Sequence, residues 1–384
     1  MIAERYIRYF CNYSAHVDIQ ERARNNGYAF LHAAPYQGIH LMTLFAAVPM
    51  KFIGPVHIRG WELNEAIHVP LATYETPLWA TTNRGAKVSR EAGGILTTLI
   101  DERMTRSIVL QGDNAQTCLD VTQAIRDRRE EMAVIVRQSS RFAQLADIHH
   151  QIAGNLLYLR FEFTTGDAAG HNMVTQAADL LMAWLLQEYA SLRHISVSGN
   201  FCVDKKVSAV NGILGRGKYV VSEITIPRAL CLSILKSTPE KIAELNVKKN
   251  LIGSILAGGL RTANAHFANM LLGFYLATGQ DAANIVEGSQ GIVHTECQGD
   301  DLYFSVTIPN IIVGTVGNGK HLPFVQDNLE RMGCLRHAEP GEQARRLALI
   351  CAATILCGEL SLMAAQTNHG ELMRSHLALE RQVR

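Results

Sequence analysis

The feature that most constrains this chain is a nearly uninterrupted apolar run close to its C-terminal end. From Leu347 to Ala365 the sequence reads LALICAATILCGELSLMAA, in which Glu359 is the one charged residue. A membrane-spanning helix needs about 18 consecutive apolar residues with few or no charges. Because Glu359 interrupts the run, we interpret it as a helix buried in the core of a folded protein, around which a large apolar core must pack.

Length and charge agree with a large folded protein. The chain has 384 residues, 48% of them hydrophobic, and this length usually gives more than one domain. Its 36 basic and 35 acidic side chains leave a net charge of +1, which argues against binding to nucleic acid or to a membrane surface through bulk charge. Only 18% of residues are charged, below the usual quarter, so we expect much of the surface to be hidden in an oligomer.

Targeting and redox signals are lacking in the sequence. The eight cysteines are widely spaced and form no CxxC pair, which is unlike a disulfide framework or a zinc site. The first residues, MIAERYIR, contain no apolar segment of signal-peptide length. We therefore expect a soluble cytoplasmic protein with no membrane partner and free thiols.

Local patterns predict a mixed fold with an insertion. Residues 48–73 look strand-like, 77–100 look helical with Gly93 and Gly94 interrupting, and strands and helices then alternate in a compact stretch up to about residue 197. In that stretch we expect strands at 107–111, 133–136 and 155–163, and helices at 115–130, 139–147 and 172–192. Beyond it we expect a strand at 219–225, helices at 227–236, 238–250 and 255–278, a β-rich part at 287–314, and helices at 322–332 and 340–376. The predicted class is α+β, and the predicted domains are an N-terminal helical arm (1–47), a large mixed α/β domain (48–106 and 198–384) and a small α+β insert (107–197).

Three short segments carry acidic and basic side chains that could take part in catalysis. Glu75 stands between Thr, Tyr and Pro at a predicted strand end, where it could equally be a solvated turn residue. The segment SGNFCVDKK (198–206) places Asp204 beside Lys205, either as an ordinary surface loop or as an ammonium group that stabilises a developing oxyanion. Asp281 follows Gly279 after an apolar helix, either as a helix-capping residue or as a carboxylate that tunes a neighbouring group.

Two glycine-rich segments and a late histidine complete the candidates. TGDAAGHNM (165–173) opens a long predicted helix, whose free N–H groups suit a dinucleotide phosphate, although it is no GxGxxG fingerprint. VGTVGNGK (313–320) is either a second such loop or a hairpin, and His376 is either a solvated helix residue or a general acid near the chain end. No metal is expected, because His149-His150 and His294-x-x-Cys297 lack two further ligands at metal spacing.

In order and spacing, these segments together resemble the hydroxymethylglutaryl-coenzyme A (HMG-CoA) reductase family, from about Val48 to Glu380. The motifs DKK (204–206) and GQDAA (279–283) are similar to those of the class I branch of that family, and we expect a soluble form without the membrane anchor of that branch. The resemblance implies the two-step, four-electron reduction of HMG-CoA to mevalonate and CoA in the mevalonate pathway of isoprenoid synthesis. It implies NADPH as hydride donor, with NADH as an alternative.

The resemblance also implies residue roles. The four catalytic residues would be Glu75, Lys205, Asp281 and His376. Lys205 would stabilise the hemithioacetal oxyanion, His376 would protonate the departing CoA thiolate, and Glu75 would donate a proton in the second reduction. Asp281 would hold Lys205 and raise the pKa of Glu75 by like-charge repulsion.

The remaining positions carried over by the resemblance fall into two groups. The substrate side would comprise Arg106, Ser198, Asn200, Asp204, Lys206, His266 and Asn269. The nucleotide side would comprise Ser140, Arg141, Phe142, Asp167, Ala169, Gly170, His171, Asn172, Val316 and Gly317, with Arg141 and Asn172 near the 2′-phosphate. The insert would then be the NAD(P)-binding domain and the large domain the substrate-binding one. The protein would be a homodimer or dimer of dimers with its active site at the subunit interface, and no nucleic-acid partner.

The chain departs from the family pattern at several positions. The sequence Tyr74-Glu75-Thr76-Pro77 replaces the usual Glu-Gly-Cys motif. His171 replaces a Met or Ala, and Asn318 and Lys320 alter the second glycine-rich loop. These differences leave two alternatives open. One is an NADH-linked homologue that oxidises mevalonate, and the other is a catalytically silent CoA-binding homologue.

Overall fold

The computed structural model describes residues 46–336 and 338–380. From Met50 onward the chain forms one compact unit. The predicted N-terminal arm, 1–47, lies outside the described residues except for its last two positions.

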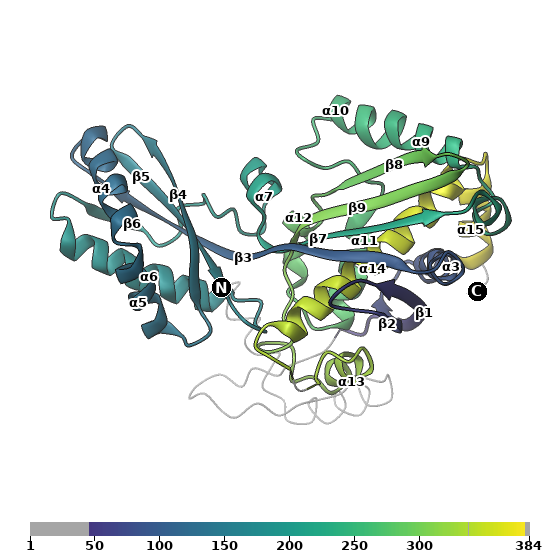
Figure 1. The fold of residues 1–384 in the computed structure, drawn as a ribbon, viewed down its shortest axis with the longest axis horizontal. Coiled ribbons are helices and arrows are strands. Elements are labelled where there is room, and N and C mark those ends of the chain that lie inside the picture. Colours follow the sequence, from purple (N-terminus) through teal and green to yellow (C-terminus); the bar gives the residue numbers. More distant parts are fainter. Residues whose placement is uncertain (1–45, 337, 381–384) are drawn as a thin grey trace, which may run out of the picture. The chain divides into compact units, whose positions relative to one another are not determined.

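A mixed sheet is the framework of the fold (Figure 1). Its main strands follow the order β2-β1-β3-β7-β9-β8, in which β1 and β3 are parallel and the other neighbours are antiparallel. Their bounds are β1 Met50–Arg59, β2 Glu65–Ala72, β3 Ile95–Gln111, β7 Gly217–Ile226, β8 Ile292–Gln298 and β9 Asp301–Ile311.

The long strand β3 belongs to two groups of strands. Leu96 to Arg103 pair with β7, whereas Met104 to Gln111 pair with β5. Around the second half of β3 lie the remaining strands, which are β4 Gln144–Ala153, β5 Leu156–Thr164 and β6 Arg193–Ser196. In Figure 1 the strand runs continuously from one group to the other.

The apolar run identified in the sequence is the central helix α14, Glu342–Gln366, and the prediction of a buried helix is confirmed. By length and composition alone α14 could cross a membrane, because an 18-residue window of it has a mean hydropathy of 2.0. However, 94% of this 18-residue window is buried inside the protein. The buried Glu359 carboxylate accepts hydrogen bonds from the backbone N–H groups of Ala265 and His266, so its polar atoms are satisfied.

Two clusters of buried apolar side chains form the core. The larger surrounds α14 and the main sheet, and includes Phe267, Phe274 and Phe304. The smaller lies around β5 and α6 and includes Phe161 and Phe163. The boundaries of the predicted domains at 107 and 197 remain a prediction, because β3 crosses the first of them without a break.

Helices cover the strands. Those beside the smaller core are α4 Ala115–Asp127, α5 Arg129–Ser139 and α6 His171–Glu188. The others are α3 Pro77–Glu91, α7 Ala209–Leu214, α8 Arg228–Leu230, η1 Cys231–Leu235, α9 Pro239–Leu245, η2 Asn246–Gly253, α10 Ser254–Leu256, α11 Phe267–Ala277, η3 Ala282–Asn284, α12 Ile285–Gly288, α13 Pro323–Arg331 and α15 Glu371–Glu380.

The mixed α+β class is confirmed, but several local predictions were wrong, including the single helix predicted over 340–376, which is divided into α14 and α15. Residues 133–136 belong to helix α5 rather than to a strand, and 144–147 begin strand β4 rather than ending a helix. The helix predicted over 77–100 ends at Glu91, because Gly93 and Gly94 both adopt positive φ angles (86° and 102°) and Ile95 starts β3. The helix predicted over 255–278 is two helices, α10 and α11, separated by a ten-residue connection whose Gly258 and Arg261 also have positive φ angles.

Candidate active site

A cavity of about 710 Å³ lies where the two cores meet. It is lined by Arg106 of β3, the start of α6, the 204–205 segment, the segment before η3, and the 316–320 loop. Of the residues singled out in the sequence, it brings together Arg106, Ser140, Ala169, Gly170, His171, Asn172, Asp204, Lys205, Asp281, Val316 and Gly317. Segments more than a hundred residues apart therefore converge on one hollow.

The closest pair of opposite charges in this cavity is Lys205 and Asp281. The Lys205 Nζ lies 2.7 Å from Asp281 Oδ2, and both side chains are partly exposed. The hydrogen bond that the Lys205 ammonium donates to Asp281 raises the pKa of Lys205. Burial acts against ionisation of Asp281, but Lys205 and the Ala283 N–H hold the pKa of that carboxyl below its usual value. Lys205 is therefore a fixed positive charge at neutral pH.

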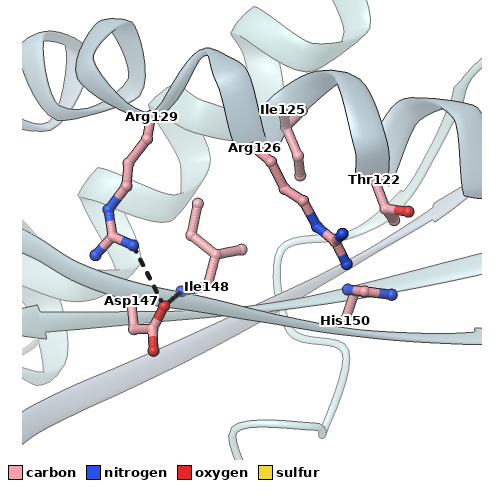
Figure 2. Close-up of a pocket in the computed structure, with 7 residues that line it drawn as sticks. All are labelled: Thr122, Ile125, Arg126, Arg129, Asp147, Ile148 and His150. Atoms are coloured by element: carbon pink, nitrogen blue, oxygen red, sulfur yellow. Dashed lines mark hydrogen bonds and ion pairs between the residues drawn. The ribbon is translucent and has the colours of Figure 1, made fainter.

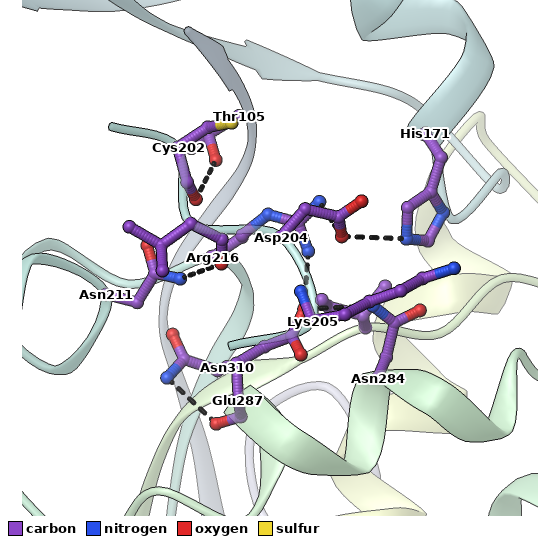
Figure 3. Close-up of polar contacts among 12 residues, drawn as sticks. Thr105, His171, Cys202, Asp204, Lys205, Asn211, Arg216, Asn284, Glu287 and Asn310 are labelled. Carbon is purple, nitrogen blue, oxygen red and sulfur yellow. Dashed lines mark hydrogen bonds and ion pairs between the residues drawn. The ribbon is translucent and has the colours of Figure 1, made fainter. Parts of the chain in front are cut away.

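Behind Lys205 lies a buried chain of charges, shown in Figure 3. The Arg216 side chain is fully buried, with its guanidinium 2.8 Å from Asp204 Oδ1 and 2.8 Å from Glu287 Oε1. Glu287 Oε1 also accepts a hydrogen bond from the backbone N–H of Lys205 at 3.1 Å and one from Asn284 Nδ2 at 2.9 Å. Two carboxylates thus share one buried cation, which satisfies the requirement that a buried charge be paired.

Two of the departures from the family pattern, His171 and Lys320, face this cavity. His171 Nε2 is buried, lies 3.9 Å from Asp204 Oδ1 and makes no hydrogen bond within the described residues. Burial, reinforced by the Arg216 guanidinium, lowers the pKa of His171 to about 4, so its imidazole is neutral at pH 7. Burial likewise lowers the pKa of Lys320 to about 8, and its ammonium donates a hydrogen bond to the Gly279 carbonyl.

The two glycine-rich segments meet at the cavity wall. Ala168 forms a parallel bridge with Val316, and a Cβ on Gly314 would lie 2.4 Å from the Ala169 nitrogen, so only glycine allows this approach. Gly170 has a φ of 93° and directly precedes α6, which exposes the first N–H groups of that helix to the cavity. Gly317 has open space where a Cβ would stand.

Other predicted residues lie elsewhere. The Glu75 carboxylate accepts a hydrogen bond from Asn269 Nδ2 at 2.9 Å, and neither residue lines the cavity. His266 is nearly buried, with its Nε2 3.9 Å from Glu359 Oε2. The exposed residues Ser198, Asn200 and Lys206 flank the 204–205 segment without lining the cavity.

Three residues expected on the nucleotide side also lie outside this cavity. The Asp167 carboxylate accepts hydrogen bonds from the N–H groups of Gly341 and Ala344, both at 3.0 Å, so it caps the N-terminus of α14. Arg141 stacks on the ring of Phe142, and both line a neighbouring cavity of about 690 Å³. The side chain of His376, in α15, lies outside the described part of the structure.

A smaller cavity, of about 240 Å³, lies between α4 and β4 and contains none of the predicted site residues (Figure 2). Arg126, Arg129 and His150 point towards it, and the Arg129 guanidinium lies 3.5 Å from Asp147. The Asp147 carboxylate also lies 3.7 Å from His149 on the same strand. We assign this cavity no part in the chemistry of the larger one.

Sequence reasoning missed Arg216, Glu287 and Asn284. A signal was present, since Arg216 and Glu287 each interrupt an apolar stretch, in ILGRGKYVV (213–221) and IVEG (285–288). Charged residues in such positions are almost never fully buried unless they are paired. The sequence could not show that these two would pair with each other across 71 positions.

The family profile described as hydroxymethylglutaryl-coenzyme A reductase matches residues 41–381. A Pyrococcus horikoshii protein named 3-hydroxy-3-methylglutaryl-coenzyme A reductase is 44% identical over 338 residues, which is 87% of this chain and 81% of the relative. A Solanum tuberosum protein named 3-hydroxy-3-methylglutaryl-coenzyme A reductase 3 is 41% identical over 343 residues. The aligned region covers 88% of this chain and 59% of the relative.

Solved structures have the same fold. The class II 3-hydroxy-3-methylglutaryl-CoA reductase from Streptococcus pneumoniae, bound to NADPH in open conformations, gives a TM-score of 0.68 at 19% identity, covering 85% of this chain and 78% of that one. Another structure, of the 3-hydroxy-3-methylglutaryl-coenzyme A reductase of the same organism, gives a TM-score of 0.68 at 17% identity. The match covers 93% of this chain and 97% of that chain. At these identities the likeness shows the fold alone.

Proposed function

Because the chain belongs to the hydroxymethylglutaryl-coenzyme A reductase family, we propose that it reduces HMG-CoA to mevalonate and free CoA in two successive steps, with NADPH as the hydride donor. The observation that carries this proposal is the Lys205–Asp281 pair, at 2.7 Å, in a cavity bounded by the N-terminus of α6. The pair supplies a fixed cation, and the helix N-terminus supplies an anion site. The cation suits the oxyanion formed when an acyl thioester is reduced, and the anion site suits a phosphate-bearing donor.

The cavity fits a reduced nicotinamide dinucleotide. The first N–H groups of α6 are free to bind a phosphate, Gly317 leaves open space beside them, and the buried Nε of Arg106 makes no hydrogen bond within the described residues. Ser140, Ala169, Gly170, Asn172 and Val316 would complete the binding surface. When bound, NADPH would supply a hydride for each reduction. Arg141, with Phe142 and the neighbouring cavity, would serve the 2′-phosphate end, and Asp167 would act indirectly through its cap on α14.

The residues of this chain would handle charge and protons. Each reduction places negative charge on a carbonyl oxygen, and the Lys205 ammonium, kept charged by Asp281, would stabilise that oxyanion. His376 would protonate the departing CoA thiolate, and Glu75 would donate a proton in the second reduction. Ser198, Asn200, Asp204, Lys206, His266 and Asn269 would bind the acyl substrate.

Two observations support a dimer with the active site at its interface. Glu75 and Asn269 bind each other away from the cavity of Lys205 and Asp281, so a second subunit could bring the two groups together. In addition, η2 and α10 expose a set of apolar side chains, namely Val247, Leu251, Ile252, Ile255 and Leu256. Exposed apolar patches of this kind mark protein–protein contacts.

Composition and relatedness support the remaining assignments. The near-zero net charge supports a protein without a nucleic-acid or membrane partner, working in the cytoplasm in soluble form. The higher identity to an archaeal and a plant relative than to class II structures supports a class I-like enzyme. We assign nucleotide binding to the insert (107–197) and substrate binding to the large domain.

A single assay tests the function. Purified protein is mixed with HMG-CoA and either NADPH or NADH, and loss of the reduced-nicotinamide absorbance is followed. We expect two equivalents of NADPH consumed for each CoA thiol released. Faster use of NADH, or net reduction of NAD⁺ with mevalonate and CoA, would replace the proposal by the oxidative alternative. If no turnover is seen with either NADPH or NADH, the protein would instead be a catalytically silent CoA-binding homologue.

A further inference from the structure

The segment that carries Lys205 has an unusual backbone. Asn200, Val203 and Lys205 all have positive φ angles (57°, 46° and 54°), a conformation that is costly for residues other than glycine and most of all for a β-branched valine. Such a conformation persists only where neighbouring groups hold it.

Hydrogen bonds to the segment come from buried side chains. Asn211 Nδ2 donates to the Val203 carbonyl at 2.8 Å, and the Cys202 N–H donates to Ser107 Oγ at 3.0 Å. At Lys205 itself the backbone N–H donates to Glu287 Oε1, a fully buried carboxylate on the short helix α12. This contact fixes the peptide from which the Lys205 side chain reaches Asp281.

Glu287 is in turn fixed from three sides. Its Oε1 accepts from Arg216 Nη1 and from Asn284 Nδ2, and its backbone carbonyl accepts from Asn310 Nδ2 at 3.1 Å. Arg216 links this carboxylate to Asp204, the residue immediately before Lys205. Asp204 therefore pairs directly with the buried Arg216 guanidinium, and Lys205 is linked to it through the Glu287 carboxylate, which accepts the Lys205 peptide N–H (Figure 3).

We propose that Glu287 and Arg216 are positioning residues that hold Lys205 in the geometry needed for oxyanion stabilisation. Neither lines the cavity, so they act through Lys205 and Asp204 and have no direct contact with substrate. The inference rests on the proposed reductase function and on the role given to Lys205. Its test separates the two, because the first control is the turnover of the unaltered enzyme.

The decisive comparison is between Glu287→Gln and Glu287→Ala. All three hydrogen bonds to the Glu287 side chain reach Oε1, whereas Oε2 is buried without a partner in the described residues. A glutamine can place its oxygen at the Oε1 position and keep every contact, but an alanine cannot. We expect Glu287→Gln to retain kcat within about fivefold and Glu287→Ala to lose at least tenfold in kcat, a range typical of a mispositioned charge. KM for HMG-CoA should change little.

A pH profile distinguishes positioning from a general loss of stability. The basic limb of the rate profile should report deprotonation of Lys205, whose pKa the contact with Asp281 raises. If the hydrogen bond between the Lys205 N–H and Glu287 is lost, the basic limb of the rate profile should move to lower pH in Glu287→Ala. In Glu287→Gln, which keeps this bond, the basic limb should stay in place. As a matched control, Glu162→Gln alters an equally buried carboxylate, bound by Arg103 and Arg160, and should leave the limb unmoved.

The outcomes decide the inference in either direction. If the unaltered enzyme turns over and Glu287→Ala keeps both its kcat and its basic limb, the inference is wrong while the reductase function stands. A glutamine variant as impaired as the alanine variant would also overturn it. If Glu287→Ala does not fold, Arg216→Lys replaces it. A lysine cannot bridge both carboxylates as the arginine fork does, so a tenfold loss of kcat is expected, and unchanged kinetics would refute the inference.

Discussion

At the scale of single residues, the Lys205 ammonium is the group on which the proposed chemistry depends most. Replacing it by alanine removes the cation that would stabilise the oxyanion, so we expect Lys205→Ala to lower kcat by about 10²–10³-fold or more. Steady-state assays with HMG-CoA and NADPH measure this loss. Lys87→Ala is the control, since Lys87 is an exposed lysine in α3 that pairs only with Glu91 among the described residues. If Lys205→Ala lies within a few-fold of the unaltered enzyme, the oxyanion role is wrong.

His171 gives a second prediction at this scale, concerning pH and stability. Its pKa of about 4 in the folded state lies below the 6.5 of an ordinary histidine, so the unfolded chain takes up this proton first as the pH falls. The associated stability is fully present above about pH 6.5 and is lost as the pH falls towards 4. Between pH 7 and 5 the free energy of unfolding should therefore fall by about 2 kcal/mol more than in a His171→Met variant. Urea unfolding of both proteins at several pH values measures the difference, and parallel curves would contradict the neutral buried imidazole.

At the scale of elements, the crossing of α3 and α14 depends on one glycine. A Cβ on Gly85 would lie 2.0 Å from the backbone oxygen of Cys357, and both helices are fixed by the core, so neither can move aside easily. We expect Gly85→Ala to destabilise the fold by about 3 kcal/mol or more. The matched change Gly253→Ala, in η2, meets only one atom, at 3.8 Å, and should leave the stability within about 1 kcal/mol. Thermal unfolding of the two variants tests the contrast, and equal melting temperatures would refute it.

The elements also show how far the sequence could predict the structure. The buried helix, β5 and β7 were predictable because their apolar patterns match their burial. Strand β4 was not, because it pairs with β5 alone and its polar residues, such as Asp147 and His149, show no alternation. The run Ala133-Val-Ile-Val resembles a strand by composition, yet Met132 and Val136 lie four positions apart on the buried face of α5. Lys205, Asp281 and the segment around His171 were predictable as candidates, whereas the buried Arg216–Glu287 pair depends on tertiary contacts that no local pattern contains.

At the scale of the whole molecule, the apolar surface on η2 and α10 leads to a prediction about assembly. Leu256 is 82% exposed and Ile255 is 75% exposed, in a chain with few charges. If this surface joins two subunits, Leu256→Glu should shift the protein from dimer to monomer and lower the activity with it, because the site would be incomplete. Light scattering during size-exclusion chromatography measures the mass. Val134→Glu, an exposed apolar position on α5, is the control and should remain dimeric, and a dimeric Leu256→Glu would exclude this surface as the interface.

The strand β3 has a consequence for modularity. Inserted domains are often joined to their hosts by two flexible linkers and can be removed or exchanged as units. Here one end of the insert is the second half of a strand whose first half is hydrogen-bonded to β7 in the main sheet. A cut at residue 107 would sever that strand within the part that pairs with β5. The two halves of this protein should therefore melt in a single cooperative transition, and neither half could be exchanged between relatives without carrying the strand with it.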